Sequence, residues 1–347
     1  MNTIDMSRRE FLIKSSACAA VLLASPYMGS HSWAANREIP LRIAVEFNDH
    51  AASAYTAIDR KLYIEEGLNV AAYESYVTGA ALAAALSRGA ISAAYICLIP
   101  AINAFANGGV PIKVVCGTHL YGYGLAVNPD KIRSPEDLEK PGMRVGCLAE
   151  GTAIDTVMHR VMEQFHLDKQ KVLAQTRRMG PPKAVMAVRA KQLDAVFLPE
   201  HWVTSVERYG FSMLLSAREV WPDMIGSVLI AREELIHNSP ETVRKLVLAT
   251  KKATTWMLAN PEESAQITAR HLSFENDKTG LKDLVEDRQE LNIAPELVFR
   301  SMKHLEYETH INKKSVQDVI DNAARLGNIN KAFPADDIMD LQFLQQS

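Results

Sequence analysis

The chain has 347 residues, a formal net charge of −3 and 23% charged side chains. This mild charge balance predicts no nucleic-acid partner and no anionic membrane partner, because both require concentrated positive charge. Four cysteines in a chain of this length exclude a disulfide scaffold. Three of them follow residue 34, and an odd number in an exported protein leaves at least one thiol unpaired.

The first 34 residues have the features of an export signal. The pair Arg8-Arg9 precedes an apolar run at 17–24, and the small residues near Ala34 suit a signal peptidase. The run is too short to cross a bilayer, and Cys18 lies before most of it, so we expect no lipid anchor. Residues 1–34 therefore indicate a twin-arginine signal peptide. We expect the twin-arginine export machinery as a partner, cleavage near Ala34 and a mature protein in the periplasm.

Strands and helices are predicted to alternate after the signal. The patterns of the first half predict strands at 41–47, 69–76, 91–97 and 111–116, and helices at 51–63, 80–88 and 99–106. The second round is predicted to hold strands at 124–127, 143–148, 194–198 and 227–230, a capped turn at 134–138, and helices at 152–165, 183–191 and 201–209. From residue 239 onward we expect almost only helix. This order predicts βαβ units, and hence an α/β fold with largely parallel sheets.

Two segments of the chain follow the same pattern. Residues 85–93 and 187–195 each contain the end of a helix, a turn and the start of an apolar strand. We interpret them as equivalent units of two similar α/β lobes. A chance similarity between two ordinary βαβ pieces is the alternative.

An ordered set of motifs covers almost all of the chain after the signal. Its members are residues 57–70, 78–89, 109–115, 134–142, 187–195 and 199–202. With them, residues 40–335 resemble the periplasmic substrate-binding proteins of nitrate, sulfonate and taurine ABC importers, a group that includes binders of thiamine-precursor pyrimidines. Two departures stand out. Residues 89–92 are Gly-Ala-Ile-Ser where that family usually has Gly-Glu-Ile-Asp, and Cys97 and Cys147 replace small or polar residues, so known ligands are not carried over.

The resemblance implies a two-lobed periplasmic-binding-protein fold of type II, each lobe a mostly parallel sheet flanked by helices. Two hinge strands, at 123–128 and 224–232, would let the lobes close on a ligand. Lobe 1 would comprise 38–124 and 226–347, with the C-terminal helices, and lobe 2 would comprise 125–225. The implied function is a monomeric, non-enzymatic receptor, with no cofactor, that delivers a small molecule to an ABC importer permease in the inner membrane.

Candidate ligand-binding residues follow from the rule that ligands of open α/β sheets lie outside the carboxyl ends of the strands. The loops that follow the predicted strands supply these candidates: Asn48, Asp49, His50, Thr78, Gly79, Cys97, Leu98, Thr118, His119, Tyr121, Glu150, Gly151, Thr152, Glu200, His201 and Trp202.

Different chemistry is expected from different members of this set. Thr78 and Thr152 precede helices, whose free N–H groups suit a carboxylate, sulfonate or phosphate; plain helix capping is the alternative. Trp202 and Tyr121 would form flat walls for a ring or a cation, and the alternative for Trp202 is the apolar face of its helix. The carboxylates of Asp49, Glu150 and Glu200 favour a ligand with an amine or a nitrogen heterocycle, although each could instead cap a helix.

Other functions remain as alternatives. Cys116 and His119 have a spacing seen in metal sites, which leaves a metal or haem receptor open, although buried structural roles are favoured. An enzyme of the pyrimidine-synthesis type on this scaffold would hold a pyridoxal cofactor through a lysine, and Lys61 and Lys113 are the nearest candidates. A membrane-bound sensor could replace the importer. The i, i+4 pair Asp155 and His159 is interpreted as a surface interaction.

Overall fold

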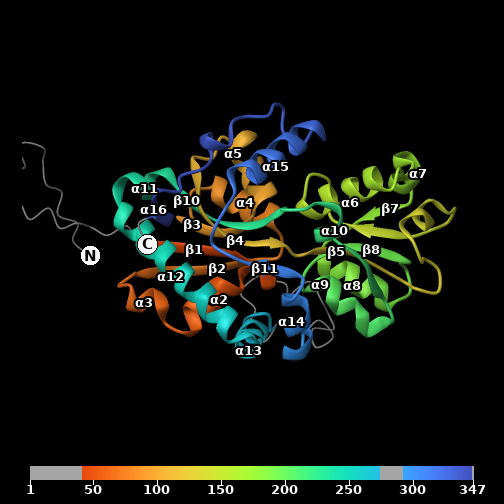
Figure 1. The fold of residues 1–347 in the computed structure, drawn as a ribbon, viewed down its shortest axis with the longest axis horizontal. Coiled ribbons are helices and arrows are strands. Elements are labelled where there is room, and N and C mark those ends of the chain that lie inside the picture. The colour runs from red at the N-terminus through yellow and green to blue at the C-terminus, as the bar shows by residue number, and fades with distance from the viewer. Residues whose placement is uncertain (1–40, 274–291, 346–347) are drawn as a thin grey trace, which may run out of the picture. The chain divides into compact units, whose positions relative to one another are not determined.

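The computed structural model describes residues 41–273 and 292–345, which form an α/β structure with two separate sheets (Figure 1). The predicted signal peptide and its cleavage site lie outside these residues. Among the helices so described, none is long and apolar enough to cross a membrane. Cys97, Cys116 and Cys147 are all buried free thiols, which confirms the expected unpaired cysteine.

The first sheet has six strands in the order β11-β4-β10-β3-β1-β2. Its strands are β1 (Leu41–Glu46), β2 (Val70–Tyr76), β3 (Ala93–Cys97), β4 (Ile112–Tyr121), β10 (Ile225–Arg232) and β11 (Leu305–Tyr307). The second sheet has five strands in the order β7-β6-β8-β5-β9. They are β5 (Tyr123–Val127), β6 (Val145–Cys147), β7 (Thr176–Arg178), β8 (Ala195–Pro199) and β9 (Ser212–Ser216).

The two sheets share one pairing plan. In the first sheet β1 is parallel to β2 and β3, and β10 lies antiparallel between β3 and β4. In the second sheet β6 is parallel to β7 and β8, and β5 lies antiparallel between β8 and β9. The predicted equivalence is confirmed, because the helix that ends at Ser87 leads into β3 and the helix that ends at Arg189 leads into β8, at matching places. We call the first sheet with its helices lobe 1 and the second sheet with its helices lobe 2.

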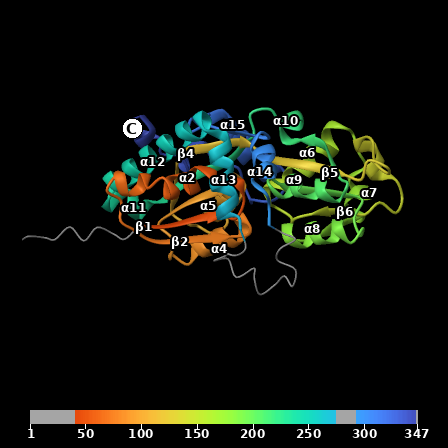
Figure 2. The ribbon, with the colours of Figure 1, turned by 90° about the horizontal axis from the view of Figure 1, so that it is seen from below.

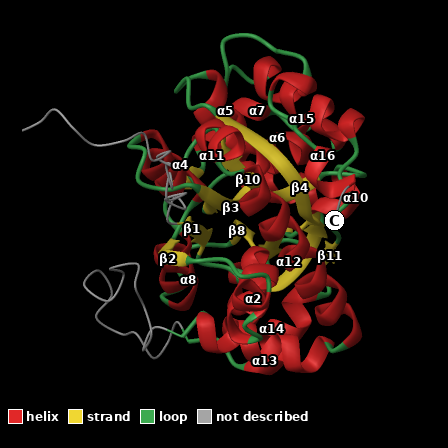
Figure 3. Ribbon diagram, turned by 90° about the vertical axis from the view of Figure 1, so that its left-hand side faces the viewer, coloured by secondary structure: helices red, strands yellow, loops and turns green. Residues whose placement is uncertain are grey.

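Helices cover both sheets (Figures 2 and 3). The α-helices of the first half are α2 (Ala52–Asp59), α3 (Leu62–Glu65), α4 (Gly79–Ser87), α5 (Leu98–Ala106), α6 (Ala153–Gln164), α7 (Lys169–Ala174), α8 (Pro181–Arg189) and α9 (Trp202–Ser205). The later ones are α10 (Ala217–Val220), α11 (Glu233–Asn238), α12 (Pro240–Ala259), α13 (Pro261–His271), α14 (Pro295–Met302), α15 (Lys313–Arg325) and α16 (Gln342–Gln345). Short 3-10 helices are η1 (Asp49–Ala51), η2 (Pro135–Glu139), η3 (Val206–Tyr209) and η7 (Ala335–Asp337). The strands β3, β5 and β8 are buried along their whole length, as expected for central strands covered on both faces.

Three sequence-based predictions of elements need correction. The helix expected at 51–63 is broken, because Lys61 has a left-handed φ of 60° and separates α2 from α3. The strand expected to end at residue 116 continues to Tyr121, because β4 pairs with both β10 and β11. The C-terminal part is not purely helical, since β11 adds a strand to the edge of the first sheet.

A buried ion pair joins the loops around the second sheet. Asp194, only 1% exposed, precedes β8 and receives hydrogen bonds from the Arg144 Nε and Nη2 atoms at 2.8 and 2.7 Å. Its Oδ1 atom also accepts a bond from Lys131 Nζ at 2.6 Å. The hydrogen bonds from Arg144 are the main cause of the lowered pKa of Asp194. The Asp194 carboxylate thus links Lys131, after β5, and Arg144, before β6, to the start of β8.

We expect Asp194→Asn to lower the free energy of unfolding at pH 7 by about 1.5–3 kcal/mol, the range for hydrogen bonds to a charged group. Because the folded-state pKa is depressed, this stabilisation is present above the unfolded value of about 4 and is lost as the pH falls below it. Urea unfolding at pH 7 and at pH 3 should therefore show a smaller difference between variant and wild type at pH 3. The exposed Asp130→Asn serves as control and should stay within about 0.5 kcal/mol of wild type.

Candidate functional site

A small cavity of about 30 Å³ lies where the two lobes meet. Lobe 1 contributes Glu46, Asn48, Val77, Thr78, Gly79, Ala80, Cys97 and Pro100, and lobe 2 contributes Tyr123, Leu148, Thr152, Ala153, Ile154 and Pro199. These residues follow or end the strands β1, β2, β3, β6 and β8, or begin β5. The cavity therefore lies at the carboxyl ends of the parallel strands of both sheets, where the α/β rule puts a ligand. Its volume is close to the share of one liquid water molecule, about 30 Å³.

Five of the residues proposed from the sequence line this cavity: Asn48, Thr78, Gly79, Cys97 and Thr152. Glu46 and Tyr123 also line it and were missed. Glu46 is the last residue of β1, and the strand-end rule predicts ligand-binding residues only in the loop that follows a strand. The available signal was a carboxylate at the end of a strand, Leu41–Glu46, whose other residues are apolar except for the exposed Arg42.

The first turns of two helices, one from each lobe, border the cavity. The Thr78 side chain caps α4 by accepting a hydrogen bond from the Ala81 N–H at 3.2 Å, and Thr152 caps α6 by accepting one from the Asp155 N–H at 3.4 Å. Capping is therefore confirmed for both threonines. It leaves first-turn N–H groups, such as those of Ala80 and Ala153, beside the cavity, where the positive ends of both helix dipoles favour a negative group.

Glu46 is a buried carboxylate without a basic partner. Its oxygens accept hydrogen bonds from the Cys97 backbone N–H at 2.7 Å, from the Cys97 thiol at 3.1 Å and from Asn48 Nδ2 at 3.4 Å. No lysine, arginine or histidine of the described residues forms an ion pair with it. Burial raises the pKa of Glu46, since desolvation penalises the charged form.

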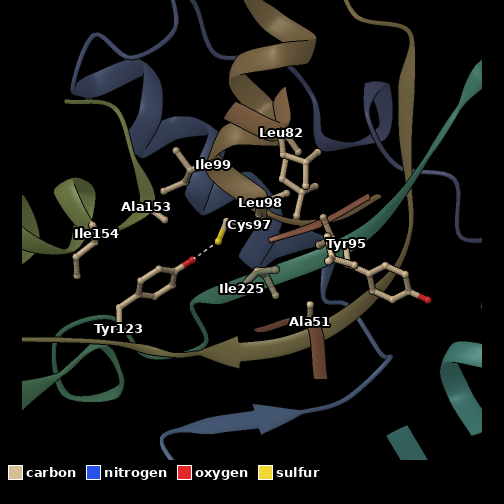
Figure 4. Packing of buried hydrophobic residues seen from close by; sticks show 14 of the residues in the cluster. Ala51, Leu82, Tyr95, Cys97, Leu98, Ile99, Tyr123, Ala153, Ile154 and Ile225 are labelled. Atoms are coloured by element: carbon tan, nitrogen blue, oxygen red, sulfur yellow. Dashed lines mark hydrogen bonds between the residues drawn. The ribbon is translucent and has the colours of Figure 1, made fainter. Parts of the chain in front are cut away.

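Cys97 joins Glu46 to a buried histidine and tyrosine. The Tyr123 hydroxyl donates a hydrogen bond to Cys97 Sγ at 2.8 Å, as Figure 4 shows. His50 Nδ1 lies 3.6 Å from the same sulfur, and His50 Nε2 donates to the Gly122 carbonyl at 2.8 Å. That bond places the ring proton on Nε2 and leaves the Nδ1 lone pair facing the thiol. Burial lowers the pKa of His50 to about 4, so the ring is neutral at pH 7.

Among the described residues, Glu46, His50 and Cys97 form a cluster that could hold a metal ion. One potential ligand atom of each residue lies within 4.8 Å of those of the other two. The sequence had instead suggested Cys116 and His119. His119 Nδ1 faces the Leu120 carbonyl at 3.2 Å, and its ring packs against that of His50 with centroids 4.4 Å apart.

Two predicted carboxylates lie in a second buried cluster rather than in the cavity lining. Asp49 and Glu200 are both fully buried. A short hydrogen bond joins Glu200 to His304 Nδ1, and Asp49 accepts one from the Ser301 hydroxyl at 2.6 Å. Burial, and then the proximity of Glu200, raise the pKa of Asp49 well above its usual range, whereas the hydrogen bond to Glu200 raises the pKa of His304. The cluster joins lobe 1, the end of β8 and the segment between α14 and β11.

The remaining candidates lie around the cavity or away from it. Trp202 and His201 are 1% exposed, and the Trp202 ring packs against Phe47 with centroids 6.4 Å apart. Leu98, Thr118 and Tyr121 are buried in lobe 1. The Glu150 side chain is 85% exposed and lies 3.8 Å from Arg178, while the Gly151 carbonyl accepts a hydrogen bond from Asn103 of lobe 1. None of these residues is in the lining of the cavity.

The prediction of a surface pair between Asp155 and His159 is wrong. Asp155 is only 2% exposed and accepts hydrogen bonds from Arg178 Nη1 at 2.6 Å and from the Gly151 N–H at 3.0 Å. His159 Nε2 lies 4.0 Å from it. The face of α6 that carries both residues turns toward β7, which a helix-spacing argument does not reveal.

Two features bear on the alternative functions. The described lining of the cavity contains no lysine, and Lys113 instead pairs with Glu233 at 3.2 Å, so the expected Schiff-base candidates are absent from this site. A larger cavity of about 710 Å³ is lined by residues of lobe 1, among them Lys61. It includes no residue of the second sheet, so the approach of the two lobes does not form it.

Comparisons with known proteins identify a family and proteins of the same fold. A model of the NMT1-like family matches residues 34–273. A provisionally named binding protein of Brucella abortus (strain 2308) is 27% identical over 282 residues, which cover 80% of this chain and 82% of that protein. The ligand-binding component of an ABC-type import system from Staphylococcus aureus, solved with zinc bound, has a TM-score of 0.72 at 17% identity and covers 88% of this chain and 98% of its own. The alkanesulfonate-binding protein SsuA from Xanthomonas axonopodis pv. citri, bound to MOPS, has a TM-score of 0.70 at 16% identity, over 87% and 98%.

The carboxylate cluster predicts a pH dependence of stability. The folded-state pKa values of Asp49 and His304 are both raised, so the folded protein holds protons that the unfolded chain releases. For His304, the stabilisation is complete below its unfolded value of about 6.5 and is lost as the pH rises through the folded value. We expect urea midpoints of the wild type to fall between pH 6 and pH 9 and those of His304→Gln to fall less. His237→Gln, an exposed histidine in α11, should leave the wild-type slope unchanged. Equal slopes for all three proteins would contradict the assignment.

Proposed function

Because the chain belongs to the NMT1-like family, we propose that it is an exported solute-binding receptor of an ABC importer. It captures a small organic molecule between its lobes in the periplasm and delivers it to the permease in the inner membrane. The observation that carries the proposal is the position of the cavity at the carboxyl ends of strands from both sheets, between two helix N-termini. The names of the Staphylococcus and Xanthomonas proteins, both ligand-binding proteins of the same fold, support it.

The lining favours a ligand with separated acidic and nitrogen-bearing parts. The N-termini of α4 and α6 suit a sulfonate or carboxylate. The Glu46 carboxylate, which can accept N–H donors, lies beside Gly79 at the start of α4, and Leu148, Ile154 and Pro100 provide apolar contact. A sulfonate, an aminosulfonate or a nitrogen heterocycle with an acidic group fits this description.

Capture requires the lobes to separate, because the cavity of about 30 Å³ has no room for such a molecule. The closed arrangement is held by a hydrogen bond from Asn103 to the Gly151 carbonyl at 3.1 Å and by a paired contact between Arg325 and Glu163 at 2.6 and 3.0 Å. The chain passes between the sheets at Gly122 and again after α10, and we place the hinge at these two passages. We retain the lobe boundaries predicted from the sequence, 38–124 with 226–347 and 125–225, as part of this proposal.

A charge at the N-terminus of α4 tests the ligand site. Ala80 is exposed, lines the cavity and lies in the first turn of α4, where an aspartate is compatible with the helix. We expect Ala80→Asp to weaken binding of an anionic ligand at least about tenfold through charge repulsion. Ala84→Asp puts the same charge on the same helix outside the cavity lining and should have little effect.

The measurement is calorimetric titration of both variants and of wild type with taurine, an alkanesulfonate, nitrate and an aminopyrimidine. Binding of a sulfonate that responds to Ala80→Asp and not to Ala84→Asp supports the assignment. Equal affinities in both variants would show that the acidic group binds elsewhere. If none of the four binds and mass spectrometry finds no small molecule on the natively exported protein, the receptor proposal fails.

Lobe closure gives a second test. Arg325→Glu replaces the paired contact with repulsion toward Glu163, and we expect a larger radius of gyration in small-angle scattering without ligand. A saturating ligand should then bring the radii of gyration of wild type and variant to a common value that differs from that of the free wild type, because the ligand sets the distance between the lobes. Lys314→Glu changes a residue of α15 whose partner, Asp318, lies on the same helix, and it should leave the radius as in wild type. An unchanged radius at saturation in every protein would contradict the hinged receptor.

A further inference from the structure

We propose that Glu46, His50 and Cys97 bind one zinc ion at the inner wall of the cavity. Glu46 and Cys97 are the last residues of β1 and β3, and His50 lies in η1, which follows β1. All three are buried, and Glu46 and Cys97 line the cavity. A Cβ at Gly79, the first residue of α4, would lie 2.6 Å from Glu46 Oε1, so the site adjoins the N-terminus of that helix. The inference does not depend on the importer function.

The distances are close to those of a tetrahedral zinc site. Zn–S, Zn–N and Zn–O bonds of about 2.3, 2.1 and 2.1 Å place neighbouring ligand atoms about 3.4–3.6 Å apart. Cys97 Sγ lies 3.6 Å from His50 Nδ1 and 3.1 Å from Glu46 Oε2, and all three ligand atoms lie within 4.8 Å of one another. Small side-chain rotations would therefore bring three ligands around one ion. The fourth position would face the cavity, whose volume of about 30 Å³ suits one water molecule.

The ring of His50 is already oriented as a metal ligand. Its Nε2–H donates to the Gly122 carbonyl at 2.8 Å, and such a bond on the outer nitrogen fixes the tautomer and presents Nδ1 as the free donor atom. A side chain at Gly122 would place its Cβ 2.8 Å from Nε2, so this close approach requires glycine. The backbone of the β4–β5 passage thus holds the ring in position.

Charge balance also favours a divalent ion. Glu46 is buried without a cationic partner among the described residues, and burial of an isolated carboxylate is costly. An ion of charge +2 bound by the Glu46 carboxylate and the Cys97 thiolate gives a neutral cluster. On binding, the Cys97 S–H bond is replaced by a sulfur–zinc bond, and the proton leaves to solvent. The Tyr123 hydroxyl, 2.8 Å from Sγ, is placed to donate to that thiolate.

The mixture of ligands selects the kind of ion. Thiolate together with imidazole suits zinc and its neighbours in the first transition row, whereas calcium and magnesium require oxygen ligands. Three protein ligands with one open position are the arrangement of a zinc site that can accept a further donor. The open position faces the space between the lobes, so the ion enters when the lobes are apart.

Cobalt(II) provides the direct readout, because thiolate ligation gives a near-ultraviolet charge-transfer band. The experiment titrates Co²⁺, and then Zn²⁺ in competition, into the mature protein after treatment with a chelator and without any organic ligand. We expect one Co²⁺ per chain, a thiolate band, and its loss on adding one equivalent of Zn²⁺. Cys97→Ser should abolish the band and weaken Zn²⁺ binding more than about 100-fold, since even loss of an outer hydrogen bond costs 10–100-fold.

Cys116→Ser is the matched control. Cys116 is also a fully buried thiol of lobe 1, but it lies on β4 outside the cluster, and its substitution should keep the band. Thermal unfolding shows whether each variant is folded, and Zn²⁺ should raise the melting temperature of wild type and Cys116→Ser but not of Cys97→Ser. His50→Gln should weaken Zn²⁺ binding while the thiol is retained.

Two results would overturn the proposal: a folded wild-type protein that takes up no stoichiometric Co²⁺ or Zn²⁺, or a band that survives Cys97→Ser. Neither result affects the receptor proposal, which is tested by organic ligands and by lobe closure. Conversely, metal binding by a protein whose lobes do not respond to any ligand would leave the zinc site in place and remove the receptor function.

Discussion

The insertion of one antiparallel strand into each parallel sheet is the constraint on which the site depends. β10 lies between β3 and β4, and β5 lies between β8 and β9, so each sheet has a central strand that borders a passage of the chain to the other lobe. Only Gly122 separates the end of β4 from the start of β5. This short connection brings the start of β5 close to the carboxyl end of β3. The contact between Cys97 and Tyr123 is the result, and the cavity forms around it. Longer connections at these passages would no longer fix the distance between the strand ends of lobe 1 and those of lobe 2.

Buried carboxylates at the ends of strands are stabilised in three different ways. Asp194 is neutralised by Arg144 and Lys131 of its own lobe, and it is a structural group. Glu200 pairs with His304, and Asp49 accepts a hydrogen bond from Ser301; both partners come from the C-terminal part of the chain. Glu46 has only uncharged donors and, unlike Asp49, it borders the cavity. A buried acid that lacks a cation and borders a cavity is the group whose charge a ligand or an ion is best placed to balance, and this distinguishes Glu46 from the two sets of structural acids.

The sequence predicted much of the fold and part of the site. Alternating patterns located most strands because the central ones are short apolar runs between turn residues, and the repeat at 85–93 and 187–195 marked equivalent units. The rule of strand ends located Thr78, Gly79, Cys97 and Thr152 at the cavity. It could not show that Glu200 turns toward His304, because the two residues are more than 100 positions apart and the contact depends on where α14 packs. It also could not predict the left-handed Lys61, since lysine has no preference for that conformation.

The size of the cavity decides which of the two proposed occupants, a metal ion or an organic molecule, fits between the closed lobes. About 30 Å³ accommodates a water molecule or an ion with one added ligand, and it excludes a sulfonate or a ring. An ion at Glu46, His50 and Cys97 would therefore be compatible with the closed lobes, whereas an organic molecule would hold them farther apart than they are here. If both bind, the open position of the ion lies on the wall that the nitrogen-bearing end of the molecule would meet. A nitrogen donor could then coordinate the ion directly, and the acidic end would lie close by at the helix N-termini, since Glu46 Oε1 is beside Gly79 at the start of α4. The lone carboxylate would act on such a ligand through the metal, which explains how a buried acid with a raised pKa can still contribute charge to recognition.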